Sequence, residues 1–495
     1  MKSFRILLVI ILSVFAGRVF NVNAQTLTNF YAFLGFPNDG ALPLAGLMQG
    51  SDGNFYGTAS QGGANNVGTV FRISPSGGYT NLHSFIRSLD DGVEPEAGLV
   101  QGSDGNLYGT TFAGGMTSNG TVFRISPSGS YTNLHSFTGS PDGALPMAGL
   151  VLGSDGNLYG TTSQGGTTNF NIFTSTAGYG TVFRISPTGT YTTLYAFAGS
   201  PNSGAYPEAG LVLGSDGNFY GTTEYGGNGP CNVGFGVGCG TIFRISTGGT
   251  FTNLHSFTGS PNDGSKPLAG LVQGSDGNFY GTTASGGTNN DGMAFRISPT
   301  GAYTKLHIFV DSPDGKLPEA GLVQGGDGNF YGTTAIGGTQ GSGTIFRISF
   351  SGAYTNLYSF SGSPIDGARP MAGLVQGGDG NFYGTTYSGG TTNFNGFTLS
   401  YGYGTVFKLT VPLNPPPYPI NQITGIQLSD ANVVLSIPSI AYETYQLQFS
   451  SSMNPTNWVN VPGVSVTNGI GALLTLTNFG GAVGPQGFYR FDITP

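Results

Sequence analysis

Residues 154–162 have the sequence Ser-Asp-Gly-Asn-Leu-Tyr-Gly-Thr-Thr, and this stretch recurs along the chain with little change. The phrase Asp-Gly-Asn-(Phe/Leu)-Tyr-Gly-Thr occurs seven times, beginning at Asp52, Asp104, Asp155, Asp216, Asp276, Asp327 and Asp379. The intervals between these aspartates are 52, 51, 61, 60, 51 and 52 residues. A constant period interrupted by two insertions indicates a tandem-repeat architecture.

Each repeat contains four segments with strand character. In the third repeat they are Ala148 to Leu152 (strand A), Asn157 to Thr162 (B), Thr181 to Ser186 (C) and Tyr191 to Phe197 (D). The Asp-Gly pair between strands A and B predicts a type I′ hairpin turn. Strands C and D are apolar or β-branched on both faces, which favours sheets packed between neighbouring sheets. Four short strands in each repeat are typical of a β-propeller blade, so the predicted fold is all-β.

The two ends of the array indicate that the propeller is closed. The segment Thr26 to Phe33 matches strand D, whereas the last repeat stops after strand C at Gly404 to Thr410. The chain therefore has seven copies each of strands A, B and C, six internal copies of strand D, and one at the N-terminus. A seven-bladed ring whose last blade is completed by the N-terminal strand explains this offset. A right-handed β-helix is the alternative, although it would not require the offset.

Residues 1–24 have the pattern of a signal peptide. Lys2 and Arg5 precede an apolar run from Ile6 to Ala16, and a small-residue cleavage site lies before Gln25. The run is too short for a membrane span, which needs about 20 residues. Removal of this segment changes the formal net charge from −8 to −11, because it contains three basic residues and no acidic ones. This acidic balance, without any basic run, argues against nucleic acid and anionic membranes as partners.

The repeat array spans residues 25–411 and is followed by a proline-rich linker at 412–421. Residues 422–495 contain short alternating segments separated by turn signals, which predict a small Ig-like or related β-sandwich. The single tryptophan, Trp458, is expected in its core. The only cysteines, Cys231 and Cys239, lie in one glycine-rich loop and predict a local disulfide in an oxidising compartment.

The repeat resembles the GloVer tandem repeat of exported bacterial proteins. The likeness covers residues 26–411 and is carried by Gly153 to Thr162, Gly165-Gly166 and Gly180 to Ser186. It implies a propeller-like fold and a secreted or extracellular location, with the periplasm as the alternative. It implies no particular activity. The C-terminal segment resembles the small β domains that end many exported bacterial proteins, through Tyr445 to Trp458 and Phe488-Tyr489-Arg490.

Polar residues that recur once in every blade are interpreted as structural. The seven repeat aspartates are expected to form hydrogen-bonded pairs with the cation of strand C, which is Arg72, Arg124, Arg184, Arg244, Arg296, Arg347 or Lys408. The four histidines occupy one strand-D position and should lie around a ring: His83, His135, His255 and His307. A second acidic series occupies the connection from strand D to strand A and reads as turn residues: Asp39, Asp91, Asp142, Asp263, Asp314 and Asp366. We predict no metal site and no cofactor.

Long insertions are the most informative departures from the repeat. They lengthen the connection between strands B and C in blades 3, 4 and 7, and all three should lie on one face. Loops on a rigid scaffold commonly carry function, and exposed aromatics commonly mark binding surfaces. The candidate ligand-binding residues are therefore Phe170, Phe173, Tyr179, Phe235, Phe394, Phe397, Tyr401 and Tyr403. The alternative is that these rings pack their own loops.

These features favour an exported, non-enzymatic protein that binds carbohydrate or a cell-surface protein through the long-loop face. No catalytic residues are assigned. One alternative is a propeller hydrolase or lyase with a metal in the central channel, for which the acidic residues outside the main repeat pattern give a weak lead: Glu94, Glu96, Glu208, Glu224 and Glu319. A structural envelope or matrix protein is the other alternative. The sequence does not indicate an oligomeric state.

Overall fold

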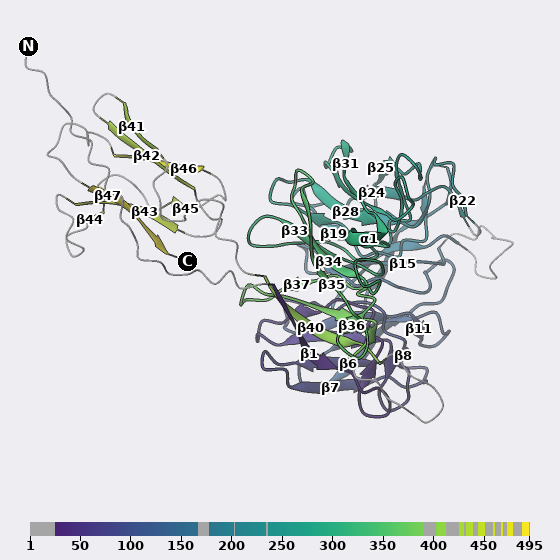
Figure 1. Ribbon diagram of the computed structural model, residues 1–495. Helices are drawn as coiled ribbons and strands as arrows, with labels where there is room; N and C mark the ends of the chain where they lie inside the picture. Colours follow the sequence, from purple (N-terminus) through teal and green to yellow (C-terminus); the bar gives the residue numbers. More distant parts are fainter. Residues whose placement is uncertain are drawn as a thin grey trace, which may run out of the picture.

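The computed structural model describes residues 25–166, 178–201, 203–233, 236–390 and 402–411, together with strands between residues 425 and 494. Residues 25–411 form seven four-stranded antiparallel sheets arranged in a ring, which is a seven-bladed β-propeller as predicted (Figure 1). Each blade has the order A-B-C-D, with strand A nearest the axis. The predicted signal peptide lies outside the described residues.

The two inner strands of each blade are short. The A strands are β3 (Met48–Gln49), β9 (Val100–Gln101), β14 (Val151–Leu152), β19 (Val212–Leu213), β27 (Val272–Gln273), β32 (Val323–Gln324) and β37 (Val375–Gln376). The B strands are β4 (Phe55–Ala59), β10 (Leu107–Thr111), β15 (Leu158–Thr162), β20 (Phe219–Thr223), β28 (Phe279–Thr283), β33 (Phe330–Thr334) and β38 (Phe382–Thr386).

The two outer strands complete each blade. The C strands are β6 (Thr69–Ile73), β12 (Thr121–Ile125), β16 (Thr181–Ile185), β24 (Thr241–Ile245), β30 (Met293–Ile297), β34 (Thr344–Ile348) and β40 (Thr405–Thr410). The D strands are β7 (Tyr79–Ser84), β13 (Tyr131–Ser136), β17 (Tyr191–Ala196), β25 (Phe251–Ser256), β31 (Tyr303–Ile308), β35 (Tyr354–Ser359) and, from the N-terminus, β1 (Thr26–Ala32).

The ring closes in the predicted way. Strand β1 pairs antiparallel with β40, from Thr26 opposite Thr410 to Ala32 opposite Thr405. The N-terminal strand therefore completes blade 7, whose other strands come from the end of the array. This pairing confirms the closed ring over the open β-helix.

Two sets of contacts join neighbouring blades around the axis. A strand-B threonine hydroxyl of each blade donates to an alanine carbonyl at the start of the next blade, and the Thr385 hydroxyl closes the set on the Ala45 carbonyl at 3.0 Å. The seven glycines that precede strand A form a second closed set. A Cβ added at Gly46 would come within 3.0 Å of the Gly373 carbonyl oxygen, and Gly373 has the same relation to Gly321. Glycine lets the inner ends of the blades approach this closely.

Strand A is shorter than predicted because its first residues contact the preceding blade. In blade 3 we expected a strand from Ala148 to Leu152, whereas β14 begins at Val151. The Ala148 carbonyl accepts the Thr110 hydroxyl of blade 2 at 2.9 Å, and Gly149 lies against the Gly98 carbonyl. The backbone of this segment therefore bonds between blades before it joins its own sheet.

The hydrophobic core lies between the blades. Strand-B tyrosines of one blade pack on strand-B phenylalanines of the next, as in the Tyr220–Phe279 pair with ring centroids 3.9 Å apart. The equivalent Tyr383–Phe55 pair, at 4.2 Å, joins blade 7 to blade 1. Glycine in the Tyr-Gly-Thr phrase is also a packing requirement, since a Cβ at Gly160 would come within 2.6 Å of the Phe183 ring.

The Asp-Gly turn differs from the predicted type I′ turn. Gly156 has a φ of 77°, but Asp155 does not adopt a positive φ. The backbone amide of Gly153 bonds the Asn157 carbonyl at 2.8 Å, so three residues form the loop. A three-residue loop with glycine in the left-handed region needs only one positive φ.

The B–C and D–A connections lie on the same face, as expected. They pair in short two-stranded ribbons: β2 (Gly40–Ala41) with β5 (Gln61–Gly62), β8 (Gly92–Val93) with β11 (Ala113–Gly114), β18 (Gly204–Ala205) with β21 (Tyr225–Gly226), β26 (Gly264–Ser265) with β29 (Ser285–Gly286), and β36 (Gly367–Ala368) with β39 (Ser388–Gly389). A further ribbon pairs β22 (Asn232–Val233) with β23 (Gly236–Val237), and α1 (Asp311–Asp314) is the single helix in the described residues.

The C-terminal segment forms two sheets. One contains β41 (Gly425–Ser429), β42 (Asn432–Pro438) and β46 (Leu473–Asn478), and the other contains β43 (Thr444–Ser450), β44 (Val459–Asn460), β45 (Thr467–Asn468) and β47 (Phe488–Thr494). Trp458 lies outside the described residues, and Leu447, which is buried, is the one side chain of this segment whose burial the structure describes, so the sandwich stays a prediction. In the part of the chain that the structure describes, no helix is long and apolar enough to cross a membrane.

The Thr385 hydrogen bond gives a test of ring closure. Replacement of Thr385 by valine keeps the side-chain shape but removes the donor to the buried Ala45 carbonyl. We expect the free energy of unfolding to fall by about 1–3 kcal/mol, measured by urea denaturation. Thr339→Val, at an exposed position, should change it by less than about 0.5 kcal/mol. Equal effects of the two substitutions would contradict a role for this bond in closure.

Candidate functional site

The repeat aspartates bind their own turns. The Asp155 carboxylate accepts hydrogen bonds from the Asn157 side-chain amide at 2.7 Å and from the Tyr159 hydroxyl at 2.8 Å. Burial acts to raise the pKa of this carboxyl, but the bonds from Asn157 and Tyr159 lower it below its usual value. The same arrangement occurs in all seven blades, so it is part of the scaffold.

The prediction that the strand-C cation pairs with the repeat aspartate is wrong for six of the seven blades. Arg184 lies opposite Tyr159 in the register of strands B and C, and the tyrosine hydroxyl reaches the carboxylate. Only Lys408, among the seven strand-C cations, forms an ion pair with its aspartate, at 2.9 Å from Asp379. The pairs expected for the arginines, within or between blades, do not form among the described residues: Arg72, Arg124, Arg184, Arg244, Arg296 and Arg347 make no ion pair with a repeat aspartate.

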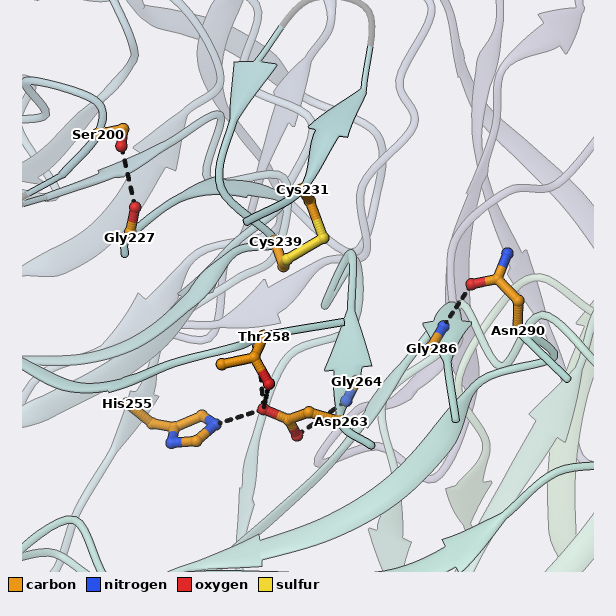
Figure 2. Close-up of a disulfide and its surroundings, with 10 residues drawn as sticks. All are labelled: Ser200, Gly227, Cys231, Cys239, His255, Thr258, Asp263, Gly264, Gly286 and Asn290. Carbon is orange, nitrogen blue, oxygen red and sulfur yellow. Dashed lines mark hydrogen bonds and ion pairs between the residues drawn. A yellow bond between two sulfur atoms is a disulfide. The ribbon is translucent and has the colours of Figure 1, made fainter. Parts of the chain in front are cut away.

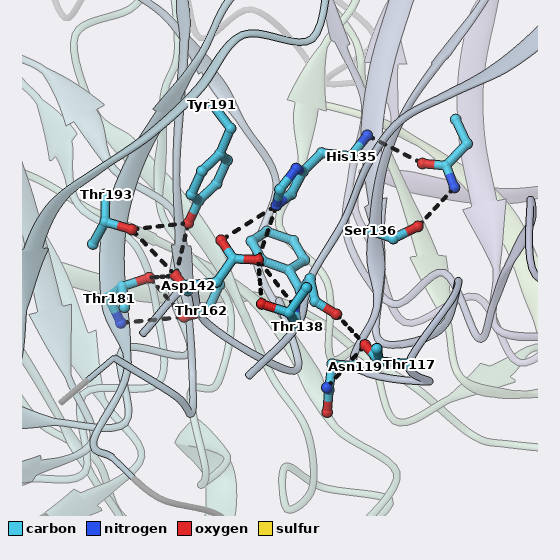
Figure 3. A network of polar contacts seen from close by, with 12 residues as sticks. Thr117, Asn119, His135, Ser136, Thr138, Asp142, Thr162, Thr181, Tyr191 and Thr193 are labelled. Atoms are coloured by element: carbon cyan, nitrogen blue, oxygen red, sulfur yellow. Dashed lines mark hydrogen bonds and ion pairs between the residues drawn. The ribbon is translucent and has the colours of Figure 1, made fainter. Parts of the chain in front are cut away.

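The four histidines are held between blades. His135 Nε2 lies 3.1 Å from Asp142 in the following connection, and its ring stacks on Tyr191 of the next blade at 4.1 Å (Figure 3). His83, His255 and His307 make the same two contacts, with Asp91 and Tyr131, Asp263 and Tyr303, and Asp314 and Tyr354. Among the described residues, no group of three or more His, Cys, Asp or Glu side chains is placed to hold a metal ion.

Two of the eight predicted binding aromatics can be placed. Tyr179 and Tyr403 are half-buried at the ends of their B–C connections, and their rings lie over Gly199 and Gly35. The remaining six, Phe170, Phe173, Phe235, Phe394, Phe397 and Tyr401, lie outside the described residues. The two that are placed pack at least partly on the scaffold.

The D–A connections contain variable positions beside an invariant proline. The residue before this proline has a φ between 54° and 56° in every blade. It is leucine in three blades and a different residue in each of the other four: Leu42, Glu94, Leu145, Tyr206, Lys266, Leu317 and Arg369. Non-glycine residues seldom adopt this conformation, which costs of order 1 kcal/mol or more. Its recurrence with a changing side chain makes this ring of residues a place where blades can differ in function.

These variable residues are joined to the long loops. The Tyr206 amide donates to the Tyr179 carbonyl at the end of the blade 3 loop, at 2.9 Å, and the Lys266 amide donates to the Cys239 carbonyl at 3.0 Å. The Tyr206 carbonyl in turn accepts the Glu224 amide at 2.9 Å. Backbone hydrogen bonds therefore join four connections around blade 4.

A continuous strip of side chains results. The Tyr179 and Tyr206 rings meet edge to face with centroids 6.3 Å apart, and Tyr206 meets Tyr225 in the same way at 5.8 Å. The Lys266 ammonium lies 3.0 Å from the Tyr225 hydroxyl and 3.2 Å from the Glu224 carboxylate. Glu208 interacts electrostatically with Glu224. We call this set the tyrosine–glutamate strip: Tyr179, Tyr206, Tyr225, Lys266, Glu224 and Glu208.

Positive charges offset only part of the negative charge of the acids in this region. Burial and the neighbouring Glu224 charge raise the pKa of Glu208 above its usual range, against the opposing charge of Lys266. Burial, reinforced by Glu94, raises the pKa of Glu96 to about 7. The Glu96 charge also acts on Glu208, although Glu208 lies just before blade 4 and Glu96 just before blade 2. The strip therefore contains the Glu224–Lys266 ion pair beside the Glu208 carboxyl, whose raised pKa favours the protonated form.

The predicted disulfide is present and lies beside the strip. Cys231 and Cys239 are joined with a Cα–Cα distance of 5.1 Å, close to Gly259 of the next connection (Figure 2). Because the Cys239 carbonyl accepts the Lys266 amide, the disulfide fixes the end of the blade 4 loop at the point that positions Lys266.

Sequence reasoning found part of this site. Glu208 and Glu224 were identified as acids outside the main pattern, and Tyr179 as a loop aromatic. Tyr206, Tyr225 and Lys266 were missed. Comparison of the residue before the invariant proline across the seven repeats would have found Tyr206 and Lys266, because that position varies while the proline after it does not.

The fold and this strip define a seven-bladed propeller protein with a polar and aromatic site on its long-loop face. A profile described as the Gloeobacter/Verrucomicrobia repeat matches residues 13–235 and 229–414. The chain belongs to this repeat family, which confirms the GloVer resemblance. No protein among the curated ones matches the sequence.

Several solved propellers are similar in fold. Virginiamycin B lyase from Staphylococcus aureus has 18% identity and a TM-score of 0.48, covering 78% of this chain and 100% of its own. Puromycin hydrolase has 14% identity and a TM-score of 0.42, covering 84% and 62%. Aldose sugar dehydrogenase from Streptomyces coelicolor has 14% identity and a TM-score of 0.37, covering 66% and 98%. These likenesses carry no argument about activity.

The raised pKa of Glu96 gives a pH test. Since the folded state keeps a proton that the unfolded state has released, Glu96 lowers stability as pH rises from about 4.5 to 7. Each pKa unit corresponds to about 1.4 kcal/mol, so after allowance for partial exposure the loss should be about 1–3 kcal/mol. Urea denaturation at both pH values should show that Glu96→Gln removes this loss.

Glu94→Gln serves as the companion variant, because it leaves Glu96 in place and removes one charge that raises its pKa. It should reduce the pH-dependent loss without abolishing it. Parallel pH profiles for the original protein and Glu96→Gln would show that Glu96 titrates normally.

Proposed function

We propose that this protein is an exported, non-catalytic module that binds carbohydrate on the long-loop face, with the tyrosine–glutamate strip as the core of its site. One observation carries the proposal: around blade 4, side chains that differ from the repeat contact one another. The opposite face instead repeats one Asp–Tyr hydrogen bond in all seven blades. The signal-peptide pattern and the disulfide support export.

The chemistry of the strip suits sugar hydroxyls. Carboxylates accept hydrogen bonds from hydroxyl groups, and a protonated carboxyl and an ammonium group donate them. Tyrosine adds a rigid, amphipathic surface that costs little conformational entropy when it binds. Glu224, Glu208 and Lys266 supply the polar groups, and Tyr225 supplies a half-exposed ring.

A second candidate function is acid–base catalysis at the same strip. It is favoured by one observation: the Glu208 carboxyl has a raised pKa beside Glu224, which is paired with Lys266. A carboxyl group with a raised pKa beside an ion-paired carboxylate can act as an acid next to a base. Turnover of a bound glycan that is lost in both Glu208→Gln and Glu224→Gln would replace the binding proposal with this one.

A glycan array followed by calorimetry tests carbohydrate binding. For the best glycan, Tyr225→Ala and Glu224→Gln should each weaken binding about 10-fold, which corresponds to about 1.4 kcal/mol for the lost ring or charge. Tyr225→Phe, which keeps the ring, should lose less. Glu208→Gln should weaken binding as well. Its matched control is Glu319→Gln, which should bind normally because Glu319 occupies the same repeat position in blade 6, away from the strip.

Well-folded protein that binds no glycan on the array would overturn the carbohydrate proposal. Equal weakening by Glu319→Gln and Glu208→Gln would also count against it, since a general change in charge would then account for the effect.

A further inference from the structure

A run of exposed apolar side chains lies on one side of the propeller. Leu34 and Phe36, in the connection from blade 7 to blade 1, are 59% and 58% exposed, and Leu89, in the next connection, is 66% exposed. All follow strand D directly and therefore lie at the outer edge of the long-loop face. Together with their exposed neighbours they form the apolar rim: Leu34, Phe36, Ile86, Leu89, Met116 and Ile365.

Hydrogen bonds and a ring contact join the connections that contain these residues. The Asn29 side-chain amide donates to the Ile365 carbonyl at 3.4 Å, which ties the connection before blade 7 to β1. Tyr31 of β1 stacks on Tyr79 of β7 at 4.6 Å, which holds the two following connections together. The Gly115 amide bonds the Asp91 carbonyl at 2.7 Å, so Met116 lies next to the connection that contains Leu89.

The rim is a departure from the repeat. The other connections have Gly-Ser-Pro or Asp-Ser-Pro after strand D, whereas these two have Leu34-Gly35-Phe36-Pro37 and Ile86-Arg87-Ser88-Leu89. Single exposed apolar residues are common, as Phe350 on the opposite face shows, but an adjacent group on consecutive connections marks an interaction surface.

The charges within the rim indicate what covers it. Arg87 and Asp90 flank Leu89 in the same connection, and both side chains are exposed. Each lacks an ion-pair partner among the described residues, unlike Lys316, which pairs with Asp311 in another connection. In a two-fold symmetric contact one patch meets its own copy, so Arg87 would face Asp90 of the partner subunit and Asp90 would face Arg87 of the partner subunit.

We propose that the apolar rim is a homodimer interface, with a second copy of this chain as its occupant. Leu34, Phe36, Ile86 and Leu89 supply its apolar centre, and the two reciprocal Arg87–Asp90 pairs set its register. In a ring of seven blades, the junction of blades 7 and 1 lies opposite blade 4. The dimer therefore leaves the tyrosine–glutamate strip of each copy uncovered. This interface does not depend on the proposed carbohydrate binding.

Sedimentation equilibrium of the purified protein tests the interface. The original chain should be dimeric at micromolar concentration. Arg87→Asp and Asp90→Arg should each raise the dimer dissociation constant at least 10-fold, because each places like charges opposite one another. The combined variant exchanges both charges and should return to within about 3-fold of the original value, a restoration that a merely structural role of either residue would not produce.

Two further variants separate the rim from general surface effects. Leu89→Glu should weaken the dimer at least 10-fold, and Phe350→Ser, an exposed aromatic on the opposite face, should leave it unchanged. A monomeric original protein at 100 μM would overturn the proposal. Failure of the combined charge exchange to restore the dimer would overturn it too, and would point to a different partner protein on this surface.

Discussion

The pairing of β1 with β40 is the constraint on which the propeller depends. Every blade buries both of its faces against neighbours, so an open ring would leave two apolar faces uncovered at once. The segment that follows β1 contributes Phe33, which is buried among Phe71, Phe55 and Tyr383. The Thr385–Ala45 hydrogen bond and the contact of Gly46 with Gly373 exist only because this pairing brings blade 7 beside blade 1.

The same constraint explains where variation is permitted. Several kinds of contact join two blades, so a change in one repeat would disturb its neighbour. They are made by the strand-B tyrosines, by the glycines that precede strand A, and by histidines such as His135. The residues beside the invariant proline are fixed through their backbone amides and carbonyls instead. Their side chains are therefore free to differ, and Tyr206 and Lys266 occupy this position on either side of blade 4.

The repeat pattern was sufficient to predict the blade number, the closure and the bounds of strands B, C and D, because these follow from period-2 patterning and turn residues within one repeat. The early start of strand A was wrong because the Ala148 carbonyl bonds to the neighbouring blade and Gly149 packs against it. The expected Arg184–Asp155 pair was wrong because Tyr159, which lies opposite Arg184, donates its hydroxyl to the Asp155 carboxylate instead. The first relation joins two repeats, and the second depends on how strands B and C pair within one blade.

The candidate site was only partly predictable for a related reason. Glu208 and Glu224 differ from the repeat in charge and were noticed. The left-handed backbone at Tyr206 and Lys266 gave no signal, because residues before proline usually adopt extended conformations. Their position is set by hydrogen bonds to the Tyr179 and Cys239 carbonyls, which come from the preceding blade.

The order of the strands in blade 7 also has a consequence for biosynthesis. Strand β1 is synthesised before every other strand of the propeller, yet its partner β40 begins at Thr405, 373 residues after the end of β1 at Ala32. At about 5–20 residues per second, this delay is roughly 20–75 s. During that time the nascent chain has an unpaired β edge, the kind of edge that promotes aggregation. The first strand of the propeller therefore lacks its partner until the last one emerges, and residues 26–32 are the segment that must be kept from pairing elsewhere.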